Sequence, residues 1–234
     1  MTDGERSIRE TGIAECDFAA RVGDVHVLGV LHESPLAITR VTGAITRYKP
    51  DVVAIEASEE AISQYHPDVQ DARWPPRDEL EAAAYITDRD YDLLLAGIDT
   101  SEYTIPDEFE GLDREIFVEL GILDETESLT RSTYYELDIP LIRRWRAETE
   151  ERAPELFEEI LADRDESMAG HLHALASGDD IDTVVASVGV QHLTGIIDLL
   201  SDPSTISEEL IECPPLADYR LFPRDSPYSS YSDG

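Results

Sequence analysis

Lysine, cysteine, tryptophan and long apolar runs are all scarce in this chain of 234 residues. Lys49 is the only lysine, and 18 basic residues stand against 52 acidic ones, for a formal net charge of -34. Without a basic face to neutralise phosphates, the chain is not expected to bind nucleic acid. No apolar run approaches the roughly 18 residues of a membrane span, and no secretory signal follows Met1. We therefore expect a cytoplasmic protein without a membrane span.

The two cysteines, Cys16 and Cys213, are isolated from each other and from other metal-binding residues. Their spacing excludes a zinc ribbon or a redox pair and gives no support to a disulfide. We expect two reduced thiols, which agrees with a cytoplasmic location.

The excess of acid indicates an adaptation to salt. The carboxylates are spread along the chain and apolar residues make up 41% of it, which excludes a disordered acidic chain. Self-repulsion of this size is largely screened only at molar salt, where the screening length falls to about 3 Å. We expect a surface adapted to a salt-rich cytosol, as in a haloarchaeon.

Two stretches share one form: a buried apolar strand, a glycine and, three residues after it, a histidine. They are Val25 to His32, with Gly29, and Val184 to His192, with Gly189. Two further apolar runs, Asp51–Glu56 and Leu93–Asp99, read as strands that end in a carboxylate. The carboxyl ends of parallel strands meet at one edge of a sheet. We expect the polar groups to meet there, with His32 and Glu56 on neighbouring strands of a βαβ unit.

The order of these elements predicts an α/β fold with a central, mostly parallel sheet flanked by helices. Helices are expected over 36–48, 57–65, 77–90, 154–175 and 193–200, and a short strand over 210–213. The loop 64–76 is placed to lie over the site, and residues around 100–150 suggest a helical insertion. We divide the chain into a loose leader (1–20), a single α/β domain (21–221) and a mobile tail (222–234).

His32, His192 and Glu56 form the candidate site. Two imidazoles and a carboxylate at strand ends suit manganese, cobalt or zinc. In this hypothesis the histidines are metal ligands, and Glu56 is a third ligand or the base that activates water. The same groups would equally serve as a metal-free acid/base set.

Other polar residues are weaker candidates. Arg164 is expected to form a bidentate pair with a site carboxylate or a substrate carboxylate, or a surface ion pair with Glu159. Asp99 suits a helix cap or a turn as well as a site. The arginines beside Trp145 suit a partner or substrate surface, although a solvated helix face is the better interpretation: Arg143, Arg144 and Arg146. The remaining histidines are not expected at the site: His26, His66, His171 and His173.

Four stretches together resemble the TraB/PrgY family, which is related to the Tiki and GumN proteins. They are Gly23–His32, Lys49–Glu56, Arg164–Ala169 and Val184–Ile196, in that order along the chain. The sequence departs from the family pattern in two places: Ala57–Glu60 holds no arginine, and Thr100 follows Asp99 where an arginine is usual. The C-terminal membrane spans of many members are also not expected here.

The resemblance implies a fold of the erythromycin-esterase/ChaN-like kind and a site at His32, Glu56 and His192, supported by Arg164. Members of the Tiki branch act as metal-dependent proteases, and the plasmid branch is linked to shutdown of pheromone signalling. We expect a metal-dependent hydrolase of a peptide or small amide, with Glu56 and Arg164 as its catalytic residues. The alternative is a non-catalytic protein that binds a peptide or another ligand. A haem-binding function rests on analogy of fold alone.

Overall fold

The computed structural model describes residues 19–58, 61–62, 76–89, 93–100, 107–130, 133–134 and 137–217. The predicted tail, nearly all of the predicted leader, all but the last residue of the loop expected over 64–76 and most of the helix expected over 57–65 lie outside these residues.

Six strands form one sheet in the order β1-β2-β5-β3-β4-β6. The four central strands run parallel to one another: β2 (Val25–Val30), β5 (Val184–Gly189), β3 (Val52–Ile55) and β4 (Leu94–Gly97). The outer strands β1 (Ala19–Val22) and β6 (Leu216–Ala217) pair antiparallel with their neighbours. The predicted α/β class is confirmed, with a sheet that is mixed because both of its edges are antiparallel.

The expectation that the strands of His32 and Glu56 are neighbours is wrong. β5 lies between β2 and β3, with Val30 beside Gly189 and Ile55 beside Ser187. A crossover between parallel strands can leave room for a third strand, and apolar periodicity carries no information about strand order. The second strand-glycine-histidine stretch therefore enters the sheet between the first one and Glu56.

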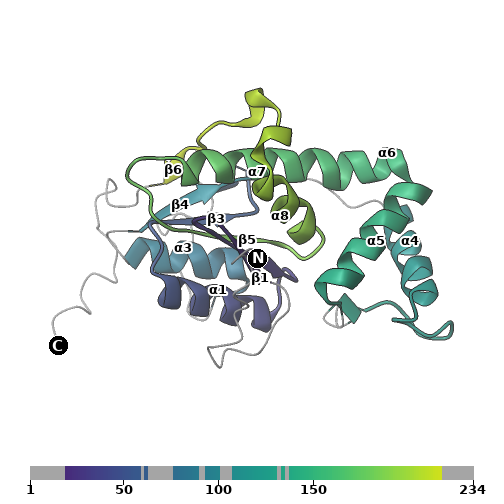
Figure 1. Ribbon diagram of the computed structural model, residues 1–234. Helices are drawn as coiled ribbons and strands as arrows, with labels where there is room; N and C mark the ends of the chain where they lie inside the picture. The colour runs from purple at the N-terminus through teal and green to yellow at the C-terminus, as the bar shows by residue number, and fades with distance from the viewer. Residues whose placement is uncertain are drawn as a thin grey trace, which may run out of the picture.

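Helices cover both faces of the sheet (Figure 1). One face carries α1 (Pro35–Tyr48) and α3 (Glu79–Arg89). The other carries α7 (Asp163–Ala176) and α8 (Leu193–Ser201), while α4 (Asp107–Glu119), α5 (Ile139–Arg152) and α6 (Pro154–Phe157) pack into the same hydrophobic core. Figure 1 shows α7 lying across the sheet and α4 and α5 together to one side of it. At the start of α1 the Ser34 hydroxyl accepts the Ala37 N–H at 3.1 Å, and Pro35 takes the first position, as expected for an N-cap.

Successive side chains along the central strands point to opposite faces of the sheet, which produces two separate hydrophobic cores. Val184, Ala186 and Val188 of β5 pack toward α7 and α8, whereas Val185 packs toward α1. Every residue of β2, β3 and β5 is buried, which explains why these strands read as continuous apolar runs in the sequence. Both layers hold the strand ends in place, so that polar groups beyond the last apolar residue have fixed positions.

The long helix predicted over 154–175 contains an irregular turn. A π-helical segment, η3 (Glu158–Ala162), joins α6 to α7 and ends just before Arg164. One extra residue per turn rotates the helix that follows, and such segments are frequent at functional sites. Here it sets the directions in which the Arg164 and Asp165 side chains point from α7.

The C-terminal part differs from the prediction. The stretch 210–213 is not a strand: its first residue, Leu210, ends η5 (Glu208–Leu210), a single 3-10 turn, and β6 starts only at Leu216. Pro214 and Pro215 lack the N–H group that strand pairing needs, so pairing can begin only after them. β1 was also missed, because its start at Ala19 falls inside the predicted leader. Within the described ranges, no helix has the length and apolar character needed to cross a bilayer.

Two helical glycines test the packing of α7. A methyl group at Gly170 would overlap the Leu210 carbonyl oxygen, whereas one at Gly111 of α4 would meet open space. We expect Gly170→Ala to lower the free energy of unfolding by about 1–3 kcal/mol through overpacking. Gly111→Ala, its matched control, should raise that energy by about 0.5–1 kcal/mol through helix propensity. Urea titrations of both variants measure this, and equal effects would show that the contact between α7 and Leu210 is wrongly placed.

Candidate functional site

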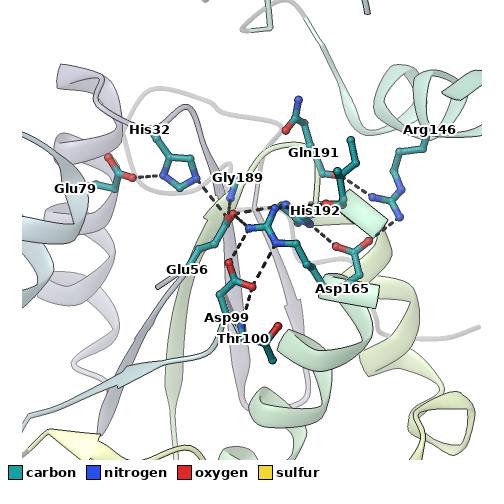
Figure 2. A network of polar contacts seen from close by, with 12 residues as sticks. His32, Glu56, Glu79, Asp99, Thr100, Arg146, Asp165, Gly189, Gln191 and His192 are labelled. Atoms are coloured by element: carbon teal, nitrogen blue, oxygen red, sulfur yellow. Dashed lines mark hydrogen bonds and ion pairs between the residues drawn. The ribbon is translucent and has the colours of Figure 1, made fainter. Parts of the chain in front are cut away.

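Polar residues gather at the carboxyl edge of the central strands. His32 follows β2, Gly189 ends β5 and leads to His192, and Glu56 and Asp99 follow β3 and β4. Figure 2 shows these side chains pointing toward one another across the ends of the strands. The structure thus brings together the sequence-predicted residues His32, Glu56 and His192, and Arg164 joins them from α7.

Glu56 lies at the centre of the group. Its Oε1 accepts a hydrogen bond from Arg164 Nη2 at 2.6 Å, and its Oε2 accepts the backbone N–H of Gly189 at 2.5 Å. The two imidazoles approach the same carboxylate: His32 Nε2 lies 3.4 Å from Oε2 and His192 Nε2 lies 3.5 Å from Oε1. Burial alone would raise the pKa of Glu56, but His192, His32 and Arg164 outweigh it and hold this pKa well below its usual range. Glu56 is therefore a buried, ionised carboxylate.

His32 is held from its other side by Glu79, the first residue of α3. Nδ1 of His32 lies 2.5 Å from Glu79 Oε1, and Glu79 Oε2 accepts the Glu33 N–H at 3.2 Å. Glu33 adopts a left-handed backbone conformation with φ 58°, which is uncommon outside glycine. Burial lowers the pKa of His32, but the Glu56 and Glu79 carboxylates raise it more, from 6.5 to about 10. The His32 side chain is still 40% exposed, so solvent reaches the site on this side.

His192 has a similar arrangement in a more buried place. Its Nδ1 lies 2.6 Å from Asp165 Oδ1, and its side chain is only 3% exposed. Arg146 of α5 donates to the other oxygen of Asp165 at 2.6 Å and to the Gln191 carbonyl at 2.7 Å. Each histidine thus has a carboxylate on Nδ1 and turns Nε2 toward Glu56.

Arg164 joins Glu56 to Asp99. Its Nη2 lies 2.6 Å from Glu56 Oε1 and 2.7 Å from Asp99 Oδ2, and its Nε lies 3.3 Å from Asp99 Oδ1. Of the partners considered from the sequence, the structure records the site carboxylates and not Glu159. Asp99 also accepts the Thr100 N–H at 2.9 Å, so it acts as a turn residue and as a partner of the site arginine.

Three residues of the network were not predicted as site residues: Glu79, Asp165 and Arg146. All three come from helices, where rotation about the helix axis decides which side chains reach the strand ends. The sequence signal for Asp165 was its position next to Arg164. Arg146 had been interpreted as part of a solvated helix face, which is wrong because it is bound to Asp165 and only 12% exposed. Arg143, one turn earlier, pairs with Asp198 at the surface.

The other histidines of the described chain lie away from Glu56. His26 stacks on Tyr48 with ring centroids 3.8 Å apart, and burial together with Arg21 and Arg47 lowers its pKa to about 4. His171 of α7 contacts the Ile98 carbonyl through Nδ1 at 2.7 Å. His66 lies outside the described residues.

The network has an unbalanced charge when its imidazoles are neutral. Four carboxylates contribute four negative charges: Glu56, Glu79, Asp99 and Asp165. The guanidinium groups of Arg146 and Arg164 contribute two positive charges, which leaves a net charge of two negative units. Two protons on the histidines or one divalent cation would balance them. Within the ranges that the structure describes, no group of three or more His, Cys, Asp or Glu side chains is arranged to hold a metal ion. The arrangement seen is the one in which imidazoles pair directly with carboxylates.

Comparisons with known proteins give no family for this chain. No protein-family model matches it, and no curated protein is similar enough to be a relative. The resemblance to the TraB/PrgY family therefore rests on the four sequence motifs.

Stability as a function of pH tests the pairing of His32. The folded-state pKa of about 10 lies above the ordinary value of 6.5, so protonated His32 stabilises the fold fully below about pH 6.5. This contribution is lost as the pH rises through about 10, with solvent screening reducing its size. We expect the stability of the metal-free parent to fall with rising pH more steeply than that of His32→Gln. Urea midpoints in chelator measure this, and parallel profiles would contradict the pairing.

Proposed function

We propose that this protein is a metal-dependent hydrolase that acts on a peptide or a related small amide. One observation carries the proposal: two imidazoles, each held at Nδ1 by a carboxylate, turn Nε2 toward one buried glutamate at the carboxyl edge of a parallel sheet. This edge is where ligands of open α/β sheets bind. Metal-binding histidines usually donate their second ring nitrogen to a carboxylate in this way.

The donor set supports a divalent ion by its chemistry. His32, His192 and Glu56 would hold it through two imidazole nitrogens and a carboxylate, a set that suits manganese, cobalt or zinc. The two unbalanced negative charges of the network match the charge of one such ion. When bound, the ion would lower the pKa of its water and polarise the amide carbonyl.

The residues around the donors have supporting tasks. Arg164 keeps Glu56 ionised and fixes its orientation, and because it already bridges Glu56 and Asp99 it orients site carboxylates rather than a substrate carboxylate. Gly189 leaves room between the donors: a methyl group there would lie 3.3 Å from Glu56 Oε2 and His32 Nε2. The exposed His32 side of the site would admit the substrate, and Glu56 would either hold the ion as a third ligand or accept a proton from the attacking water.

A second candidate is a non-catalytic protein that binds a peptide or another ligand at the same place. The observation that favours it is that both carboxylate oxygens of Glu56 already accept hydrogen bonds, one from Arg164 and one from the Gly189 N–H. A carboxylate held in this way has less freedom to act as a base.

Several finer statements belong to the same proposal. Membership of the TraB/PrgY family and the erythromycin-esterase/ChaN-like arrangement are supported by the four motifs alone. The interpretation of residues around 100–150 as a helical insertion is supported by the break in the strand-helix alternation there, where α4 and most of α5 lie. The salt-rich cytosol is supported by the formal net charge of -34.

Metal content and turnover test the leading candidate. We expect the parent, purified in molar salt and loaded with manganese, cobalt or zinc, to retain one ion per chain, and His32→Ala and His192→Ala to retain none. His173→Ala, on α7 outside the network, is the matched control and should retain the ion. Turnover of a peptide library should fall by about 10²–10⁴-fold in Glu56→Gln.

The outcomes separate the two candidates. Unchanged metal content in both histidine variants would show that the donors are wrongly assigned. Tight peptide binding without turnover by the metal-loaded parent would favour the binding protein.

The charge balance gives a separate test. If an ion replaces the imidazole protons, its binding must release up to two protons. Calorimetric titration of cobalt into chelator-treated protein, in buffers with different ionisation enthalpies, counts them. We expect between one and two protons per ion near neutral pH. Binding without proton release would place the ion away from His32 and His192.

A further inference from the structure

Arg146 connects α5 to the more buried of the two histidines. Its guanidinium binds Asp165 Oδ2 through Nη2 and the Gln191 carbonyl through Nη1, and lies over the Phe157 ring at 5.2 Å from the ring centroid. Asp165 and Gln191 are the two groups that surround His192: one binds its Nδ1, and the other is the residue immediately before it. One side chain from a distant helix therefore fixes both the partner and the backbone of His192.

The chemistry of Asp165 decides which nitrogen of His192 carries a proton. An ionised carboxylate can only accept hydrogen bonds, and Arg146 occupies its Oδ2. The remaining oxygen, Oδ1, faces His192 Nδ1 at 2.6 Å, so this nitrogen must donate. A neutral His192 then has its lone pair on Nε2, the atom that faces Glu56.

The packing leaves little freedom for another arrangement. Asp165 is 2% exposed, and Gly195 of α8 lies against it. A methyl group at Gly195 would overlap Asp165 Oδ2 and come within 2.7 Å of Arg146 Nη2. The glycine three residues after His192 thus lets α8 approach the pair closely.

We propose that Arg146 is a positioning residue that acts through Asp165 to keep the proton of His192 on Nδ1 and its lone pair on Nε2. The use of that lone pair rests on the proposed function, whereas the position of the proton does not. Arg146 performs this task by holding Asp165 Oδ1 against Nδ1, so that Nδ1 carries the proton rather than Nε2, which faces the competing carboxylate of Glu56.

An amide at position 165 should reverse the tautomer of His192. In Asp165→Asn, Arg146 would still select the oxygen of the side chain, and the amide NH₂ would turn toward His192. Nδ1 would then have to accept, and the proton would move to Nε2. The same exchange of aspartate for asparagine leaves the wrong histidine tautomer in serine-protease triads.

Long-range proton–nitrogen NMR of protein labelled with ¹⁵N-histidine reads the tautomer directly. Spectra are recorded on chelator-treated protein without substrate, at the high-pH end of the titration of the ring, and His192→Gln assigns the signal. We expect an unprotonated Nε2 in the parent, a protonated Nε2 in Asp165→Asn and a mixture of tautomers in Arg146→Met. Arg143→Met is the matched control, because it removes a nearby arginine of α5 that binds Asp198 of α8 and leaves Asp165 untouched, and it should give the parent spectrum.

Two results would overturn the proposal: a proton on Nε2 in the parent, or equal changes in Arg146→Met and Arg143→Met. Should Arg146→Met fail to fold because it leaves a buried carboxylate unpaired, Asp165→Asn combined with Arg146→Met removes that charge. Without Arg146 to orient it, the asparagine amide at position 165 should give a mixture of His192 tautomers. A single tautomer identical to that of Asp165→Asn would exclude a role for Arg146. Because neither metal nor substrate is present, failure of the proposed hydrolase activity leaves this result unchanged.

Discussion

The rest of the site depends on one buried charge, the carboxylate of Glu56 at the end of β3. A carboxylate in this position is tolerated only if it is paired and hydrogen-bonded, because an isolated buried charge is very costly. Its surroundings meet that need from four directions, with Arg164 and the Gly189 N–H at its oxygens and an imidazole on each side. The histidines in turn require acceptors at Nδ1, which Glu79 and Asp165 provide. Each charged group of the network therefore pairs with a group that needs a further partner of its own.

The order of the strands makes this network possible. Because β5 runs between β2 and β3, Gly189 arrives beside the end of β3, where its N–H reaches Glu56. The turn after β5 places His192 on the buried side of Glu56, whereas the more exposed His32 lies on the side that solvent reaches. Adjacent residues on α7 then face different partners: Arg164 binds Glu56 and Asp99, and Asp165 binds His192. The π-helical turn before them sets the rotation of that helix.

Short-range patterns made the strand ends predictable. A buried apolar run followed by a glycine and a histidine, or by a carboxylate, indicated His32, His192 and Glu56, with Asp99 as a weaker candidate, without any knowledge of the sheet. The start of β6 was a missed local signal, because Pro214 and Pro215 exclude strand pairing before Leu216. The strand order and the supporting residues of α3 and α5 were not predictable in this way. They depend on how crossovers are arranged and on which side of a helix faces the sheet, and periodicity specifies neither between distant elements. Arg146 illustrates the limit, since its sequence context is that of a surface helix and its partners lie 19 and 45 residues away.

The proposed metal site requires that His32, His192 and Glu56 share one divalent ion. Anomalous diffraction from crystals grown with cobalt, recorded on both sides of the cobalt absorption edge, tests it most directly. We expect a single strong peak at about 2.0–2.2 Å from the Nε2 atoms of both histidines and from a Glu56 oxygen, with Glu79 and Asp165 still bound to the Nδ1 atoms. A peak elsewhere, or direct pairing of the imidazoles with Glu56 at saturating cobalt, would contradict it.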